Sequence, residues 1–264
     1  MKISSFLPVL SLAKKIVYVD NLTRWINFLV RKVSSWTHKL QFYVDWAVDN
    51  PEHFDHFIDL NFQWNKTRAS FPMERGVFSS FALQRENKKL GRTLDLCCGD
   101  GFYTKYFYSL LSSEVVGIDF DSYAIKWARR NNKSDNIQYI LGDVRTNFPT
   151  GEFDNIMWDA AIEHFNENEI HSIMDKIKMG LAPNGVLSGY TIKENDDGGK
   201  HLHQHEYEFR SMEDLTRFLT PFFENVKIIE TVFPMRTNFY FYASDGVLPF
   251  EGKNVLTTRL LKEG

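Results

Sequence analysis

The second half of the chain alternates between short apolar runs and longer stretches with a helical spacing of apolar residues. Runs typical of β-strands occupy residues 93–97, 115–120, 137–141, 155–158, 185–190, 226–230 and 239–243. Amphipathic stretches near 103–111, 121–131, 166–181 and 212–222 predict helices between them. Strands that alternate with helices indicate a mostly parallel sheet covered on both faces. We therefore predict an α/β domain over residues 86–250, followed by a C-terminal tail over 251–264.

The first 85 residues have a different pattern, which predicts a helical N-terminal extension. In residues 22–40, apolar side chains recur at steps of three and four, as on one side of a helix: Leu22, Trp25, Ile26, Leu29, Val33, Trp36 and Leu40. From residue 41 to 83 the chain is rich in aromatic residues and is interrupted by Pro51 and Pro72.

Charge divides the chain in the same way. Residues 1–40 contain seven Lys or Arg against one acid, Asp20, whereas the whole chain carries −3, which leaves −9 for the rest. The basic helix either packs on the main domain with its charges in water or lies against a membrane surface or a partner. The acidic remainder disfavours nucleic acid as a partner, because nucleic-acid binding needs several cations that face phosphates.

Composition is that of a globular protein, with 43% hydrophobic and 25% charged residues. The only two cysteines, Cys97 and Cys98, are adjacent, which excludes a disulfide framework and indicates a reducing compartment. The apolar run over residues 6–13 is too short to span a membrane. We expect a cytoplasmic protein, with peripheral membrane contact through residues 1–40 as the alternative.

A glycine-containing turn follows the first predicted strand. Asp95 lies near the end of that strand, and Gly99 and Gly101 come directly before a predicted helix. Glycine permits the tight dihedral angles and the close ligand approach that nucleotide-like ligands need. The dinucleotide fingerprint requires a third glycine where Thr104 stands, so an NAD-type oxidoreductase is disfavoured.

The next predicted strands also end in acids. Asp119 ends the second strand, Asp143 follows the third, and Asp159 follows the fourth. The carboxyl ends of parallel strands form the ligand-binding edge of such a sheet. A carboxylate such as Asp119 can accept hydrogen bonds from two ribose hydroxyls.

This arrangement resembles the class I S-adenosylmethionine-dependent methyltransferases over roughly residues 92–243. The resemblance implies a doubly wound, seven-stranded, Rossmann-like sheet that binds S-adenosylmethionine and releases S-adenosylhomocysteine. It also implies the contacts of the cofactor. Its methionine part would meet Asp95, Cys97, Gly99 and Gly101, its ribose Asp119, its adenine Phe120, Gly142, Asp143 and Val144, and the pocket floor would be Asp159 and Ala160. Cys97 departs from the family, which often has glycine there.

A second group of candidate residues follows the fourth and fifth strands. Glu163 and His164 come after the fourth strand, and His205 lies in the segment after the fifth. They are the candidate catalytic residues, acting as acid, base or substrate-orienting groups, and a structural role for the histidines is the alternative. The three could also ligate one divalent ion. The segments resemble metal-assisted small-RNA 3′-terminal 2′-O-methyltransferases, but Ala160 replaces the first glutamate of their Glu-x-x-Glu-His motif, so we predict no resident metal.

The sequence thus predicts a methyltransferase that modifies a small-molecule acceptor at oxygen or nitrogen. The alternatives are an RNA 2′-O-methyltransferase that grips RNA through residues 1–40 and a cofactor-binding scaffold without catalysis. Just upstream of the first strand, where relatives have a helical lid, the lid candidates are Phe62, Trp64, Phe71, Met73 and Arg75. Ordinary packing of a helix on the sheet is the other interpretation of these residues.

Overall fold

The computed structural model describes residues 22–30, 32–34, 36–37, 71–83, 90–195, 198–202, 204–233 and 236–248. The chain divides into two compact units, Met1–Leu60 and Asn61–Gly264. The lid candidates Phe62 and Trp64 and the predicted tail over 251–264 lie outside the described residues, as do the side chains of Phe71 and Met73.

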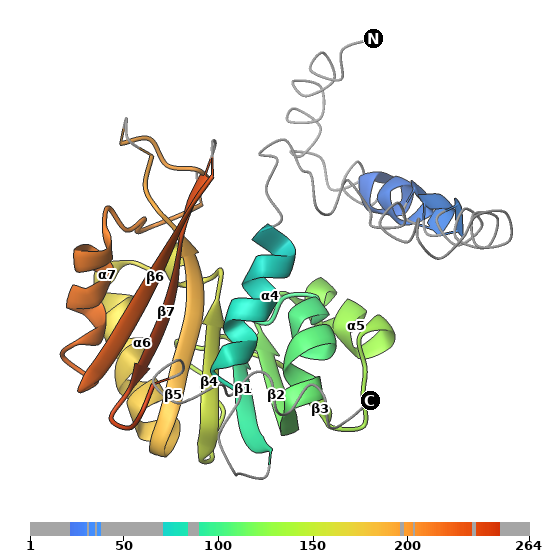
Figure 1. Ribbon diagram of the computed structural model, residues 1–264. Helices are drawn as coiled ribbons and strands as arrows, with labels where there is room; N and C mark the ends of the chain where they lie inside the picture. The colour runs from blue at the N-terminus through green and yellow to red at the C-terminus, as the bar shows by residue number, and fades with distance from the viewer. Residues whose placement is uncertain are drawn as a thin grey trace, which may run out of the picture. The chain divides into compact units, whose positions relative to one another are not determined.

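The second unit is built on a sheet of seven strands (Figure 1). Their spatial order is β3-β2-β1-β4-β5-β7-β6. Strands β1 to β5 pair in parallel, and β7 pairs antiparallel with both β5 and β6. The bounds are β1 (Gly91–Leu96), β2 (Ser112–Asp119), β3 (Ile137–Leu141), β4 (Phe153–Asp159), β5 (Leu181–Ile192), β6 (Asn225–Phe233) and β7 (Arg236–Ser244). This confirms the predicted doubly wound, mostly parallel sheet.

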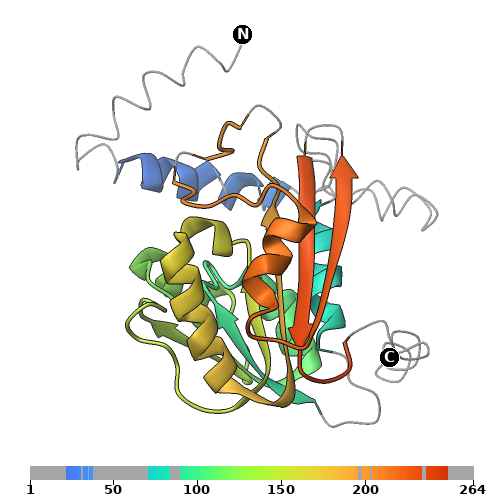
Figure 2. The ribbon, with the colours of Figure 1, turned by 90° about the vertical axis from the view of Figure 1, so that its left-hand side faces the viewer.

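Helices cover both faces of the sheet. They are α4 (Phe71–Phe81), α5 (Ser122–Asn131), α6 (Glu167–Gly180) and α7 (Met212–Leu219), with short turns η3 (Thr104–Tyr108), η4 (Ser109–Leu111) and η5 (Ile162–His164). Figures 1 and 2 show α6 and α7 on one face and α4, η3 and α5 on the other. Asn166 caps α6 and Ser211 caps α7, because the side chain of each accepts from a backbone N–H group of the first turn.

The predicted helix over 103–111 is present but is not a regular α-helix. It widens into a π-helical turn at Thr104–Tyr108 and tightens into a 3₁₀ turn at Ser109–Leu111. The irregular turn places the hydroxyl of Thr104 on Asp95 and that of Tyr108 on Asp159. The sequence pattern did not predict this, because the bonds that hold the turn come from the ends of two strands.

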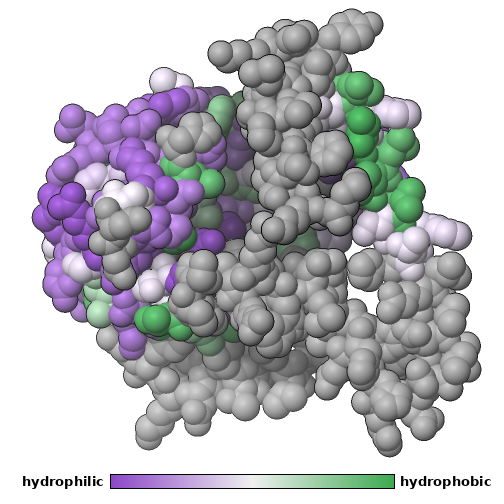
Figure 3. All heavy atoms as spheres, turned by 90° about the horizontal axis from the view of Figure 1, so that it is seen from above, coloured by the Kyte–Doolittle hydropathy of each residue, from purple (hydrophilic) through white to green (hydrophobic). Residues whose placement is uncertain are grey.

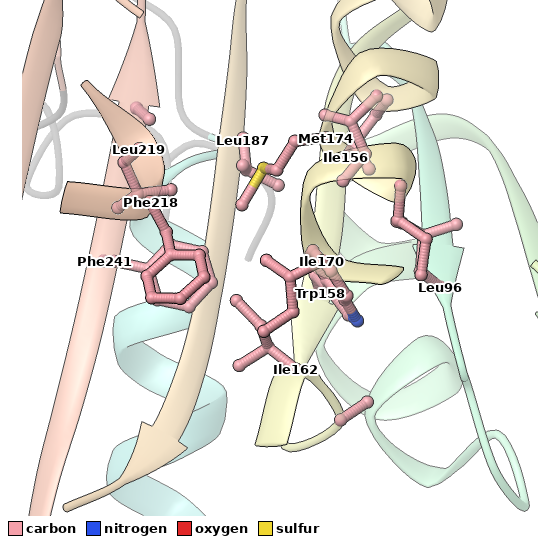
Figure 4. Close-up of a cluster of buried hydrophobic side chains, with 14 of the residues drawn as sticks. Leu96, Ile156, Trp158, Ile162, Ile170, Met174, Leu187, Phe218, Leu219 and Phe241 are labelled. Atoms are coloured by element: carbon pink, nitrogen blue, oxygen red, sulfur yellow. The ribbon is translucent and has the colours of Figure 1, made fainter. Parts of the chain in front are cut away.

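The main hydrophobic core lies between the sheet and the pair α6 and α7 (Figure 4). The strands contribute Leu96, Ile156, Trp158, Leu187 and Phe241, and the helices contribute Ile170, Met174, Phe218 and Leu219. All of these side chains are fully buried. Alternate residues of each strand point to opposite faces, so Thr93 and Asp95 point away from this core while Leu94 and Leu96 fill it. The core thereby fixes where the strand ends and their acids lie.

Helix α4 packs against the end of the sheet that contains β6 and β7. The ring of Phe78 stacks on Tyr240 with centroids 4.5 Å apart, and the hydroxyl of Tyr242 donates to the Phe78 carbonyl. Thr231 donates to Glu74 at 2.7 Å. The sequence prediction assigned these residues to the extension over 1–85, whereas α4 belongs to the unit that carries the sheet.

In the first unit, residues 22–30, 32–34 and 36–37 are helical, as their apolar spacing predicts. Figure 3 shows apolar residues gathered on this segment. Trp25, Val33 and Trp36 are about three-fifths exposed. Contact of this helix with a membrane or a partner stays a prediction. None of the described helices has both the length and the apolar character needed to cross a membrane.

Candidate functional site

The loop after β1 has three left-handed residues. Cys97, Gly99 and Gly101 have φ angles of 57°, 56° and 74°. Glycine adopts such angles without strain, whereas a residue with a side chain does so at a cost of about 1–3 kcal/mol. Cys97 therefore lies at a position that suits glycine, and the structure does not explain why cysteine stands there.

The two glycines differ in what surrounds them. A Cβ built on Gly101 would lie 2.4 Å from the Tyr139 hydroxyl oxygen, and Tyr139 is held there by a 2.7 Å hydrogen bond to the Asn132 carbonyl. A Cβ on Gly99 would meet no described atom within 4 Å. The backbone at Gly99 thus borders open space in which a ligand can approach it.

We expect Gly101→Ala to lower the free energy of unfolding by about 2–4 kcal/mol, because it adds a steric overlap to the backbone strain. Gly99→Ala should lower the free energy of unfolding by only about 1–2 kcal/mol, because it adds backbone strain without a steric overlap. Chemical denaturation of both variants measures the difference. Equal losses in the two variants would contradict the described packing of Tyr139.

The carboxylate of Asp119, at the end of β2, joins this loop to the next element. It accepts from the Gly99 amide at 2.9 Å and from the Asp121 amide at 2.8 Å. Asp119 is buried, whereas the ring of the next residue, Phe120, is 73% exposed. An acidic group and an exposed aromatic face therefore lie side by side beyond the end of β2.

The carboxylate of Asp95 lies behind the same loop. It is buried and accepts from the Thr104 hydroxyl at 2.6 Å. Burial raises the pKa of Asp95 to about 8, and the hydrogen bond from Thr104 opposes that rise. Asp159 and Asp119 are close enough for their charges to raise it further.

Asp159, at the end of β4, is held by side chains from two other elements. Its Oδ2 accepts from Arg75 Nε at 2.6 Å and from the Tyr108 hydroxyl at 2.8 Å. Arg75 comes from α4, and its guanidinium lies 4.1 Å above the Tyr103 ring. Oδ1 of Asp159 is buried and has no hydrogen-bond partner among the described residues. A buried carboxylate oxygen without a hydrogen-bond partner raises the free energy of the folded protein, and a cationic ligand that binds it would remove that penalty.

Asp143 is less available to a ligand than Asp119 or Asp95, because a neighbouring arginine already contacts its carboxylate. Asp143 is partly exposed and is chelated by its neighbour Arg145, whose Nη2 lies 2.7 Å from Oδ2. That contact lowers the pKa of Asp143. Val144 is buried, and the Gly142 amide donates to the Asp119 carbonyl at 3.0 Å. Of the predicted cofactor acids, Asp143 and Asp159 each have a side chain that is engaged by an arginine.

The charges of several of these acids reach one thiol, that of Cys97. Burial raises the pKa of Cys97, and after it the charges of four carboxylates raise it further: Asp119, Asp95, Asp143 and Glu163. The acids from the ends of β1, β2 and β3 and the candidate catalytic residue Glu163 are therefore within electrostatic reach of one loop.

Ala160, directly after Asp159, has φ 52°, and its amide donates to the Tyr190 carbonyl at 2.8 Å.

The candidate catalytic residues Glu163, His164 and His205 come together, and we call these three candidates the catalytic trio. One ligand atom from each lies within 4.8 Å of the others. Glu163 and His205 are buried, and the rings of His164 and His205 meet nearly at right angles with centroids 4.8 Å apart. The backbone joins the two segments, because the amides of Glu206 and Tyr207 both donate to the Glu163 carbonyl. Burial raises the pKa of Glu163, whose Oε2 accepts from Thr191 at 3.1 Å.

The sequence analysis did not identify Glu208 as a residue of this site, although its carboxylate contacts the trio at His205. This buried carboxylate contacts Nδ1 of His205 and also Nδ1 of His201, the latter at 2.9 Å. The His201 amide donates to it at 2.8 Å. The spacing of three residues between His205 and Glu208 was the available signal, but only the fold of the loop turns both side chains inward.

The part of the chain that contains these strand ends is similar to a known protein family. Residues 93–185 match the sequence model of a family described as a methyltransferase domain. The match runs from β1 to the start of the buried part of β5 and includes every strand end described above. These residues, about a third of the chain, therefore form a methyltransferase domain. S-adenosylmethionine is the methyl donor that the sequence analysis expects for it. No curated protein sequence matches this methyltransferase significantly.

Solved structures share its fold. The N-methyltransferase NodS from Bradyrhizobium japonicum WM9, in complex with S-adenosyl-L-homocysteine, has a TM-score of 0.54 at 14% identity over 70% of this chain and 91% of NodS. The plantazolicin methyltransferase BpumL, also solved with S-adenosylhomocysteine, has a TM-score of 0.51 at 15% identity over 67% of this chain and 84% of BpumL. The PH0226 protein from Pyrococcus horikoshii OT3 has a TM-score of 0.51 at 18% identity over 71% of this chain and 96% of that protein.

Proposed function

We propose that this methyltransferase transfers a methyl group to a hydroxyl oxygen or an amine nitrogen of a small-molecule acceptor. The observation that carries the proposal is the position of the catalytic trio. Its member Glu163 is close enough to Cys97, in the cofactor loop, for its charge to raise the thiol's pKa. The trio thus has one member within electrostatic reach of the loop, and this supports our proposal that the acceptor meets the methyl group near the trio.

The residues around the loop fit the cofactor. The described residues leave open space at Gly99 and provide no hydrogen-bond partner for Oδ1 of Asp159. That oxygen, together with the buried Asp95, suits the ammonium group of the cofactor. We assign the ribose to Asp119 and the adenine to Phe120. The adenine amino group would have to compete with Arg145 for Asp143, so the assignment of the adenosine part rests on Asp119 and Phe120.

The bound cofactor supplies an electrophilic methyl group on a positively charged sulfur. The residues of the chain orient the acceptor and exclude water, and alignment of this kind supplies up to about 7–11 kcal/mol in well-oriented reactions. The imidazoles of His164 and His205 contact the hydroxyl or amine and keep its lone pair directed at the methyl carbon. Glu208 positions the His205 ring from behind.

The affinity for S-adenosylhomocysteine should rise with pH between about pH 6 and pH 8. Asp95, whose pKa burial raises to about 8, is protonated in the free protein below that pH, whereas the ammonium of the ligand favours the ionised form. One linked proton changes the affinity by at most about tenfold per pH unit, and we expect about tenfold or more over the range. Isothermal titration calorimetry at successive pH values measures this rise.

Asp95→Asn is the matched control, because it removes the titrating group and should flatten the profile. The same proton affects stability with the opposite sign. The folded protein without ligand holds a proton that the unfolded chain releases above about pH 4, so the free energy of unfolding falls as pH rises toward 8. A wild-type affinity that falls between pH 6 and pH 8 would show that Asp95 does not face the ammonium group.

A labelling experiment tests the class of acceptor. The protein is incubated with methyl-labelled S-adenosylmethionine and, separately, with a small-molecule extract and with total RNA of its native cells. We expect label in the small-molecule fraction, because the chain outside residues 1–40 carries −9 and lacks the excess of cations that RNA binding needs. Label in RNA, with an affinity that falls steeply with salt, would replace this proposal with the RNA alternative.

A further inference from the structure

We propose that the N-terminal helix, formed by residues 22–30, 32–34 and 36–37, lies on a membrane surface that contains anionic lipids. Its apolar side chains enter the interfacial layer of the bilayer, and its cations meet the charged headgroups. The inference goes beyond the proposed function and does not rest on it. The helix belongs to the first compact unit of the chain, whereas the candidate functional site belongs to the second.

The apolar side chains of the N-terminal helix are exposed (Figure 3). The large ones are Leu22, Trp25, Ile26, Phe28, Leu29, Val30, Val33 and Trp36. With 3.6 residues per turn, all of them except Phe28 fall on one continuous arc of the helix. A helix in a globular protein usually turns such an arc toward a core, and an exposed apolar patch of this kind marks an interaction surface.

The charged residues of the same segment are all basic. They are Arg24, Arg31 and Lys32, and residues 21–40 contain no acid. With 3.6 residues per turn, positions 24 and 31 fall opposite the apolar arc, and position 32 falls at its edge. The ammonium of Lys32 lies 5.7 Å from the centroid of the Phe28 ring. A long cationic side chain at such an edge keeps its stem on apolar surface and its charge among headgroups.

A bilayer surface with anionic lipids matches both sides of this helix at once. Its interfacial layer takes up the apolar arc, and its negative potential attracts the cations. Trp25 and Trp36 are three helical turns apart on the arc, and tryptophan favours the boundary between lipid and water.

Other occupants match the helix less well. Nucleic acid would engage the cations and leave the aliphatic side chains Ile26, Leu29 and Val33 in water. A protein partner would need an apolar groove with acids along its rim, a combination that an anionic bilayer provides over its whole surface. Because the two units are one chain, binding of the helix concentrates the methyltransferase domain at the membrane.

Sedimentation of the full chain with lipid vesicles tests the proposal. One set of vesicles contains phosphatidylcholine alone, and the other contains an equimolar mixture of phosphatidylcholine and phosphatidylserine. We expect the mixed vesicles to be bound at least about tenfold more tightly, because each cation near an anionic surface contributes about fivefold. Added salt should weaken this binding, because it screens the attraction.

Three variants of the full chain separate the apolar contribution from the charged one. Val33→Glu places an acid in the apolar arc and should weaken binding to the mixed vesicles by about tenfold or more. Trp36→Ala changes no charge and should weaken it by about tenfold, because it removes apolar surface. Lys32→Gln should weaken it by about fivefold and leave binding to phosphatidylcholine alone unchanged.

Val232→Glu and Lys126→Gln are the matched controls. Val232 in β6 is 72% exposed, Val33 is 61% exposed, and Lys126 is an exposed cation of α5. Both controls change the second unit by the same substitution, so they should bind vesicles like the wild type. Thermal melting followed by circular dichroism shows that each variant is folded.

Two results would overturn the membrane surface. One is a wild type that does not bind the mixed vesicles. If that protein instead binds total RNA, or forms a dimer in analytical ultracentrifugation that Val33→Glu disrupts, the helix is assigned to nucleic acid or to a second copy of the chain. The other is vesicle binding that Val33→Glu and Trp36→Ala leave unchanged, which would place the contact elsewhere in the chain.

Discussion

Replacing Asp119 by alanine is expected to weaken the binding of S-adenosylhomocysteine by about tenfold to 100-fold. The carboxylate accepts from the Gly99 amide at 2.9 Å, so its removal loosens the loop that the ligand contacts. It also removes the charged acceptor that we assign to the ribose hydroxyls. Hydrogen bonds to charged groups contribute about 1.5–3 kcal/mol, which corresponds to that range. Isothermal titration calorimetry measures the change directly.

Asp121→Ala is the control for this experiment. Asp121 is an exposed acid two residues away that caps α5 by accepting from the Tyr123 amide at 2.8 Å. Its loss should lower the free energy of unfolding by about 1 kcal/mol and leave the affinity for the ligand unchanged. Unchanged affinity in Asp119→Ala itself would place the ribose elsewhere.

Replacing His205 by alanine is expected to lower kcat by about 100-fold while the affinity for S-adenosylhomocysteine stays within about twofold. The buried ring of His205 lies beside His164 and is contacted by Glu208, and we propose that it meets the acceptor and not the cofactor. Single-turnover kinetics, combined with calorimetry of the same samples, separates the two effects.

A purely structural histidine would behave differently. Its loss would lower the melting temperature while the specific activity of the folded protein stayed normal, and that pattern would remove His205 from the catalytic trio. His171→Ala measures the effect of losing a partly buried, ring-stacked histidine outside the site. Its kcat should equal that of the wild type.

The sheet and its acids could be predicted because local patterns determine them. The parallel strands β1, β2, β4 and β5 are buried over most of their length, so each contains a short apolar run, and the polar residue near its end marks the strand end. Because the carboxyl ends of parallel strands meet at one edge, Asp95, Asp119 and Asp159 could be expected in a common site from their positions alone. The trio could be placed near them for the same reason.

The remaining features depend on contacts between distant residues or on the local geometry of side chains and loops. Arg75 is 84 residues from Asp159 in sequence, and no local pattern predicts their 2.6 Å ion pair. Glu208 lies in a loop whose conformation decides which side chains point inward. The engagement of Asp143 by Arg145 likewise follows from side-chain geometry, and the left-handed backbone of Cys97 from the turn that the loop must make.

A crystal structure of the full chain with S-adenosylhomocysteine tests the central claim most directly. We predict the ligand at the carboxyl ends of β1, β2 and β4, with its ammonium within hydrogen-bond distance of Asp159 Oδ1, its ribose on Asp119 and its sulfur facing the catalytic trio. A ligand bound at any other place, or no ligand bound at saturating concentration, would contradict the account.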